Sequence, residues 1–108
     1  MSLADADIAF AVDLFAGLGD ISTRKMMGGL CIYADGRLFA TLDADGTVYL
    51  KAGDDFADKL RAAGSRPFVY SRKDGTSQTM AYWSLPDAAL DDPASACDWA
   101  RKALDHLT

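Results

Sequence analysis

Two Asp-Gly pairs constrain the fold more than any other feature of this sequence. They stand at residues 35–36 and 45–46, and alternating apolar residues flank them over residues 30–34, 37–42 and 47–51. An Asp-Gly pair between such runs is a strong signal for a tight β-hairpin. Because parallel strands need a long crossover connection, these short connections predict an antiparallel meander.

Alternation within these runs predicts which side chains share a face of the sheet. The apolar residues expected to lie together are Leu30, Ile32 and Ala34 in the first run, and Leu38, Ala40 and Leu42 in the second. A short strand over residues 24–27 precedes them. A further Asp-Gly pair at residues 74–75 predicts another hairpin, with strands over residues 68–71 and 78–84.

Three helices are predicted by apolar residues at helical spacing. The first covers residues 5–18, the second opens at residues 53–55 and ends at Gly64, and the third covers residues 93–107. Asp92 followed by proline supplies an N-cap and a first helical residue for the third helix.

The predicted order is therefore helix, strands, helix, two strands, helix. This order favours a two-layer α+β fold, in which a mostly antiparallel sheet carries helices on one face. The chain has 108 residues, which is the usual size of one domain. The other face of the sheet is then left for water or for a partner.

Charge and composition narrow the classes of partner. The net charge of -5 opposes non-specific attraction to nucleic acid or to anionic lipid. No apolar run approaches the roughly 20 residues that span a bilayer, and the N-terminus lacks the basic segment of a signal peptide. We therefore expect a cytoplasmic protein without a membrane contact, in which Cys31 and Cys97 are small buried hydrophobes.

Catalytic and metal-binding patterns are weak. His106 is the single histidine, and it falls in the last turn of the last predicted helix, where a cation complements the helix dipole. One histidine and two distant cysteines give no metal-ligand spacing. Most aspartates fall at predicted turns and caps, which explains them structurally. We expect no catalytic residue, no metal and no cofactor, so the chain is not expected to be an enzyme.

A short stretch between the first helix and the strands combines two cations, two thioethers and two glycines. Methionine adapts to irregular contacts, and glycine frees the backbone for a turn or a bulge. We expect this stretch, with Lys51 beside it, to contact a protein partner. The alternative is that Met26 and one glycine only shape the core. The expected partner-binding residues are Arg24, Lys25, Met26, Met27, Gly28, Gly29 and Lys51.

A different interpretation is a nucleic-acid-binding module. Basic and aromatic side chains together on a sheet are typical of proteins that bind single strands. The residues that could form such a surface are Arg24, Lys25, Lys51, Arg66, Arg72 and Lys73 with Tyr49, Tyr70 and Tyr82. The negative net charge makes nucleic acid an unfavoured direct ligand. A small-ligand binder is a third alternative.

With these residues in view, the sequence resembles the N-terminal domain of the TfoX/Sxy competence-regulator family from about Leu14 to Leu104. The matching stretches, in order, are Arg24 to Gly29, Asp35-Gly36 with Phe39, Tyr49-Leu50-Lys51, Gly64 with Pro67-Phe68-Val69-Tyr70, Met80-Ala81-Tyr82-Trp83, Pro86, Leu90-Asp91-Asp92 and Trp99-Ala100. Met27 stands where the family more often has an aromatic residue. The resemblance does not extend to the second, C-terminal domain of the full-length regulators.

The resemblance implies a fold similar to the secretion chaperones and a role as an accessory to a transcription regulator in competence. It supplies no catalytic residues. We therefore expect a small interaction domain whose partner is a protein, such as a transcription regulator, and we also expect that it can form a homodimer.

Overall fold

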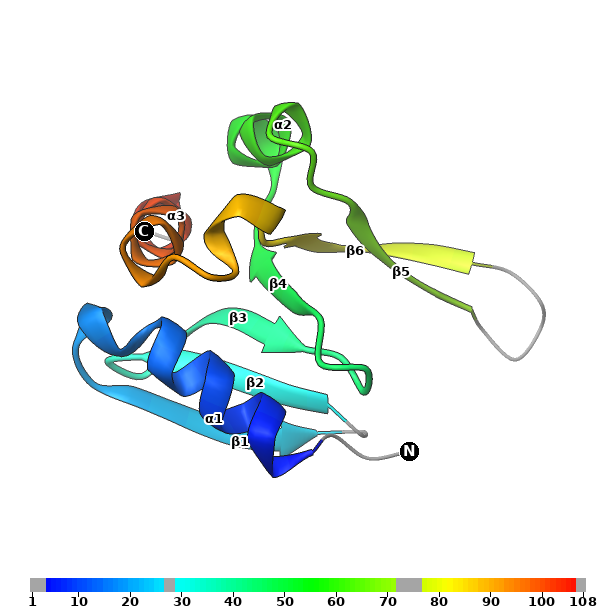
Figure 1. Ribbon diagram of the computed structural model, residues 1–108. Coiled ribbons are helices and arrows are strands. Elements are labelled where there is room, and N and C mark those ends of the chain that lie inside the picture. Colours follow the sequence, from blue (N-terminus) through cyan, green and yellow to red (C-terminus); the bar gives the residue numbers. More distant parts are fainter. Residues whose placement is uncertain (1–3, 27–28, 72–76, 107–108) are drawn as a thin grey trace.

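The computed structural model describes residues 4–26, 29–71 and 77–106. The elements follow the predicted order of helix, strands, helix, two strands, helix (Figure 1). They are α1 (Asp5–Leu14), the short 3-10 helix η1 (Ala16–Leu18), β1 (Ile21–Met26), β2 (Gly29–Ala34), β3 (Arg37–Leu42), β4 (Val48–Lys51), α2 (Asp54–Ala62), β5 (Pro67–Ser71), β6 (Ser77–Ser84), the 3-10 helix η2 (Asp87–Ala89) and α3 (Pro93–His106).

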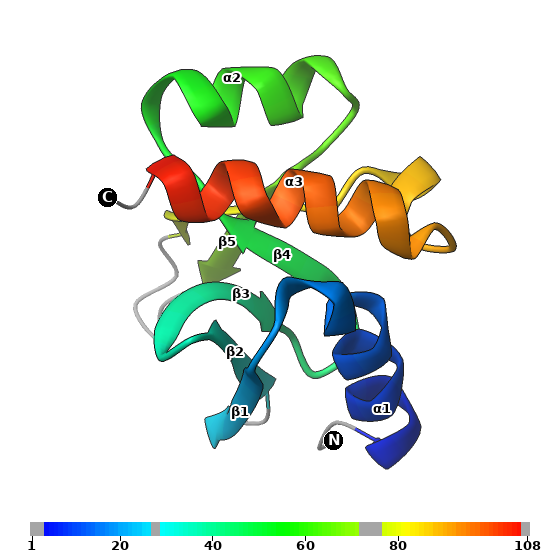
Figure 2. The same ribbon diagram turned by 90° about the vertical axis from the view of Figure 1, so that its left-hand side faces the viewer.

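The six strands form one open antiparallel sheet in the order β1-β2-β3-β4-β6-β5. α3 contacts β3 and β4, α1 packs against α3, and α2 packs against β6 and α3 (Figure 2). Figure 1 shows the β5–β6 hairpin extending away from these helices. The predicted α+β class, with an antiparallel sheet and a helical layer, is confirmed.

The hairpin at Asp35-Gly36 has the backbone that the sequence predicts. Asp35 has φ of 51° and Gly36 has φ of 81°, and β2 and β3 pair as neighbours on either side. Positive φ at both central residues defines the turn type whose twist matches a two-residue hairpin. The turn predicted at residues 74–75 lies outside the described residues, although the predicted pairing of the two flanking strands, β5 and β6, is confirmed.

The predicted face assignment is wrong at Leu38. Ala40 pairs with Ile32 but Leu38 pairs with Tyr33, so Phe39 is an extra residue at a β-bulge. Leu38 is therefore half-buried on the Tyr33 side of the sheet, and Phe39 is fully buried with Ala40. A strict alternation of side chains fails here because the bulge advances one strand by one residue.

The helix ends differ from the predicted ones by a few residues. α1 stops at Leu14, and a 3-10 turn completes the predicted segment to Leu18. α3 begins with the expected cap, since the Ser95 backbone N–H donates to Asp92 Oδ1 at 3.3 Å. Gly64 follows α2 with φ of 94°, the left-handed conformation typical of a residue that ends a helix.

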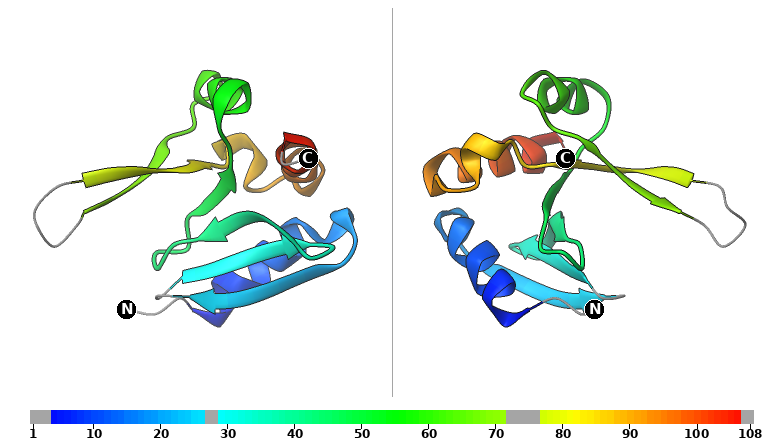
Figure 3. Two further views of the ribbon diagram at one scale, coloured as in Figure 1. Left: turned by 180° about the vertical axis from the view of Figure 1, so that it is seen from behind. Right: turned by 45° about the vertical axis from the view of Figure 1, so that its right-hand side comes forward.

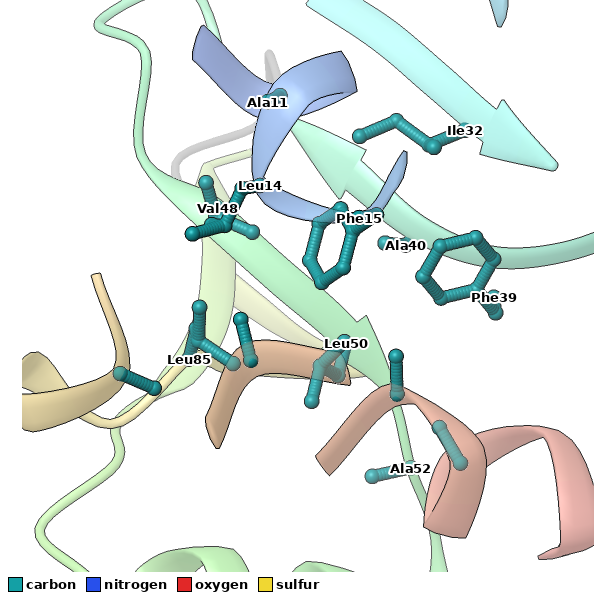
Figure 4. Packing of buried hydrophobic residues seen from close by; sticks show 14 of the residues in the cluster. Ala11, Leu14, Phe15, Ile32, Phe39, Ala40, Val48, Leu50, Ala52 and Leu85 are labelled. Atoms are coloured by element: carbon teal, nitrogen blue, oxygen red, sulfur yellow. The ribbon is translucent and has the colours of Figure 1, made fainter. Parts of the chain in front are cut away.

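One apolar core lies between the sheet and the helices (Figure 4). Phe15, which follows α1, meets Phe39 of the bulge edge-to-face, with ring centroids 5.1 Å apart. The largest fully buried side chains are Phe15, Phe39, Ile32, Leu50, Leu60 and Leu85. Cys31 and Cys97 are both buried and free, which confirms the prediction that they act as small hydrophobes. Within the described residues, no helix is long and apolar enough to cross a membrane.

Candidate interaction surface

Of the stretch from Arg24 to Gly29, the first three residues end β1 and Gly29 begins β2. Met26 closes β1 and pairs with Gly29, the first residue of β2. Met27 and Gly28, also expected to bind a partner, lie outside the described residues. The structure therefore places the described residues of this stretch at one edge of the sheet, because β1 is the outermost strand.

Arg24 and Lys25 lie on opposite faces of β1. Arg24 pairs with Cys31, while Lys25 pairs with Leu30, whose side chain is part of the core beneath the helices. Both cations are exposed. In the part of the chain that the structure describes, the ion pairs are Arg61–Asp58 and Arg101–Asp98, so neither Arg24 nor Lys25 has a carboxylate partner there.

Lys51 does not lie beside this stretch, in contrast to the expectation from the sequence. It belongs to β4, where it pairs with Tyr82, and β2 and β3 separate it from β1. Three strand spacings correspond to roughly 14 Å across the sheet. The expected site is therefore two separate places, the β1 edge and a point near the middle of the sheet.

Some backbone groups of β1 point away from the rest of the sheet. The Asp35 backbone N–H donates to the Asp20 carbonyl at 2.9 Å, so residues 20 and 35 form a hydrogen-bonded pair just before β1. Such pairs alternate along an antiparallel ladder. The backbone groups of Ser22 and Arg24 therefore point to β2, and those of Thr23 and Lys25 point away from the sheet.

In the described part of the chain, no helix covers the face of the sheet that carries Arg24. Figure 3 shows β1 and β2 in front of α1 when the molecule is seen from behind. One row of paired residues crosses this open face from β1 to β6: Arg24, Cys31, Thr41, Tyr49 and Ser84.

Aromatic rings lie along the same face. Tyr49 of β4 meets Phe68 of β5, with ring centroids 5.0 Å apart. Tyr33 of β2 and Tyr82 of β6 are half-buried next to the row. Tyr33 and Phe68 were not among the residues expected to form a surface, although alternation from Cys31 would have placed Tyr33 on this face.

Burial raises the pKa of two tyrosines, Tyr49 and Tyr82. For Tyr49, burial is the largest cause of the raised pKa. The Asp43 carboxylate raises this pKa further, and Arg66 lowers it in part. For Tyr82, burial is again the largest cause, and Cys31 and Tyr33 raise the pKa by smaller amounts. A raised pKa keeps a phenol protonated at neutral pH, so these hydroxyls can donate hydrogen bonds but are not activated as bases or nucleophiles.

The other predicted residues are dispersed. His106 is exposed at the end of α3, with its ring centroid 6.1 Å from that of Phe56. Arg66 is exposed and directly precedes β5, whereas Arg72 and Lys73 lie outside the described residues. Within the described ranges, no three residues of the types His, Cys, Asp and Glu gather in a way that could hold a metal ion.

These features define a class of protein: a small α+β domain with a basic sheet edge and an open, partly aromatic sheet face. The model of the TfoX N-terminal domain family matches residues 13–107. The chain therefore belongs to the TfoX N-terminal domain family, and the resemblance seen in its motifs is confirmed. A comparison with curated proteins gave no match.

Proposed function

We propose that this chain is a cytoplasmic protein-interaction module that assists a transcription regulator, and that the partner adds a strand to the β1 edge. Membership of a competence-related family supports the link to transcription. The proposal assigns no catalytic step to the chain. The partner binds through backbone hydrogen bonds, and its side chains determine which protein is accepted.

The single observation that carries this proposal is the chemistry of the β1 edge. Thr23 and Lys25 turn their backbone groups outward, and an added strand would satisfy these groups. Arg24 and Lys25 are exposed without a carboxylate partner in the described residues, one on each face. An extended segment carrying Asp or Glu would meet both the hydrogen-bonding groups and the two cations. The partner segment is therefore acidic.

An affinity pull-down from native lysate, with identification by mass spectrometry, tests the proposal. Wild-type protein is expected to retain a transcription regulator or a polymerase subunit. Thr23→Pro removes one outward N–H without removing a ladder hydrogen bond, because proline is tolerated where the N–H of an edge strand faces solvent. Thr23→Pro and the pair Arg24→Glu with Lys25→Glu are both expected to lose the regulator.

Thr23→Val is the matched control, because it changes the same side chain and keeps the backbone N–H. It is expected to retain the partner. Retention by Thr23→Pro, with a far-ultraviolet circular dichroism spectrum equal to wild type, would exclude strand addition at β1. Retention by the charge-reversed pair would exclude selection by the two cations.

The open face supports a second candidate, binding of single-stranded nucleic acid. The observation in its favour is the Tyr49–Phe68 pair, which could stack on bases next to the guanidinium of Arg66. A gel-shift assay at low salt, where the electrostatic attraction is strongest, tests it with labelled single strands. Binding that Tyr49→Ala abolishes would favour this candidate, and no shift at low salt would end it.

A further inference from the structure

An apolar hollow lies on the helical side of the molecule, away from the open sheet face. The C-terminal half of α1 forms one wall, and residues 90–93, which end at the start of α3, form the other. The lining residues are Phe10, Asp13, Leu14, Leu90, Asp91 and Pro93, and the volume is about 160 Å³. A cavity of about 150 Å³ holds one benzene ring, so this hollow has room for one bulky side chain.

Phe10 makes this hollow unusual. Its side chain is 46% exposed, and it is the one exposed large hydrophobic residue among those whose side-chain burial the structure describes. Leu14 lies four residues later on the same side of α1 and is buried. The wall of the hollow therefore runs from the core out to a ring that faces water, and covering that ring with another apolar group is favourable.

The surroundings of the hollow are uniformly acidic. Residues 4–23 and 84–100, which contain both walls, hold no Lys and no Arg. Together they hold eight aspartates: Asp5, Asp7, Asp13, Asp20, Asp87, Asp91, Asp92 and Asp98. Asp13 and Asp91 are themselves exposed and form none of the ion pairs found among the described residues. Of these eight, Asp98 pairs with Arg101, and the others form none of the ion pairs found among the described residues, so the charge next to the apolar ring is negative.

We propose that this hollow binds a segment of a partner protein in which one bulky apolar side chain is flanked by Lys or Arg. The apolar side chain fills the space between Phe10 and Leu90, and the flanking cations meet Asp13 and Asp91. An acidic segment would be repelled here, so the occupant differs in charge from the segment proposed for the β1 edge. The proposal does not depend on the β1 edge, because the two surfaces share no residue.

A displayed library of random short peptides tests this proposal, because the selection itself finds the segments that bind. The library is selected on the wild-type protein and counter-selected on a variant carrying Phe10→Ser and Asp91→Lys. Enriched peptides are expected to share an apolar residue with Lys or Arg close on either side. The enriched peptide with the highest count is then labelled, and its Kd is measured by fluorescence anisotropy.

Two single variants test the apolar contact and the negative charge of the hollow separately. Phe10→Ser and Asp91→Lys are each expected to weaken the labelled peptide by about tenfold or more, the scale of a central contact in an interface. Raising the salt concentration is expected to weaken it further, because exposed charges are screened. Asp55→Lys, the matched control, makes the same charge change at an exposed position of α2, outside both segments that form the hollow. It is expected to leave Kd within about threefold, given the modest effect of remote charges.

Three results would overturn the proposal. One is a selection in which the wild-type protein enriches no peptide, or only peptides that the counter-selection variant binds as well. The second is a set of enriched peptides without cations. The third is an unchanged Kd in Phe10→Ser. Circular dichroism melting of each variant shows that a loss of binding is not a loss of folding, and the Thr23→Pro variant, which affects only the β1 edge, is expected to bind the peptide as wild type does.

Discussion

Replacing Phe15 and Phe39 by leucine, singly and together, measures the contact that holds the end of α1 over the bulge in β3. The two rings meet at 5.1 Å between centroids with an interplanar angle of 87°. Both side chains are fully buried (Figure 4). Leucine keeps much of the apolar volume and removes the ring, so each variant loses the edge-to-face contact and leaves the surrounding core occupied.

The expected magnitudes follow from this geometry. Each single replacement is expected to lower the free energy of unfolding by about 1–2 kcal/mol through lost volume and lost ring contact. An edge-to-face pair contributes about 0.5–1.5 kcal/mol beyond its buried area. Because both single variants lose that same contact, the double variant is expected to be destabilised by less than the sum, and the difference equals the contribution of the ring pair.

Urea unfolding followed by circular dichroism gives these free energies by linear extrapolation. A control cycle combines Phe15→Leu with Phe56→Leu, because Phe56 lies on α2 and its ring partners, Trp99 and His106, lie on α3. That cycle is expected to be additive within about 0.5 kcal/mol. If the Phe15–Phe39 cycle is equally additive, the ring contact does not hold α1 to β3 and the bulge has no role in fixing it.

Three further predictions concern a turn, a helix cap and a titrating side chain. Gly36→Ala is expected to destabilise the fold by about 1–2 kcal/mol in thermal unfolding, because φ of 81° is unfavourable for a residue with a Cβ. Asp92→Ala is expected to cost about 1 kcal/mol in the same assay, because it removes the side-chain acceptor for the Ser95 N–H. Burial, and to a smaller extent the Asp43 carboxylate, raises the folded-state pKa of Tyr49 above the unfolded value of about 10. The resulting stability is therefore present below about pH 10 and is lost as the pH rises through the folded pKa. In urea unfolding over an alkaline pH series, Tyr49→Phe is expected to show a smaller loss of stability than wild type, and an identical loss would refute the assignment.

Local patterns in the sequence were sufficient for the elements and for much of the meander. Asp35-Gly36 predicts its hairpin because the turn type depends on just those two residues, and the observed positive φ values agree. Asp92 predicts the start of α3 because a cap is a contact over three residues. Such features depend only on residues that are close together in the chain.

Features that depend on the arrangement of strands were not predictable in this way. The bulge at Phe39 cannot be read from alternation, because an inserted residue shifts every later side chain to the other face. Lys51 was expected beside Arg24, but strand order is set by pairing over the whole sheet, and two strands separate the residues. The structure therefore places Lys51 apart from the β1 edge, and the role of these residues in binding a partner stays a prediction.

The apolar hollow was not predictable either. Its two walls come from residues 10–14 and 90–93, which are brought together only by the packing of α1 against α3. The helical spacing of apolar residues predicted the first helix and gave no reason to single out Phe10. A signal does exist in the sequence, since both segments lack Lys and Arg, but it becomes meaningful only when the segments are neighbours.

The position of Arg24 and Lys25 on the outermost strand has a consequence for how copies of this chain behave at high concentration. An exposed strand edge is a template for pairing with another copy, and natural proteins often oppose this with charged side chains. If two β1 edges met, two arginines and two lysines would be brought together across the new ladder, so the edge resists polymerisation into extended sheets. A homodimer, if it forms, would therefore have to use another surface, such as the open face with Tyr33 and Tyr82. The same two cations that we propose select an acidic partner would also keep the protein from aggregating until that partner arrives.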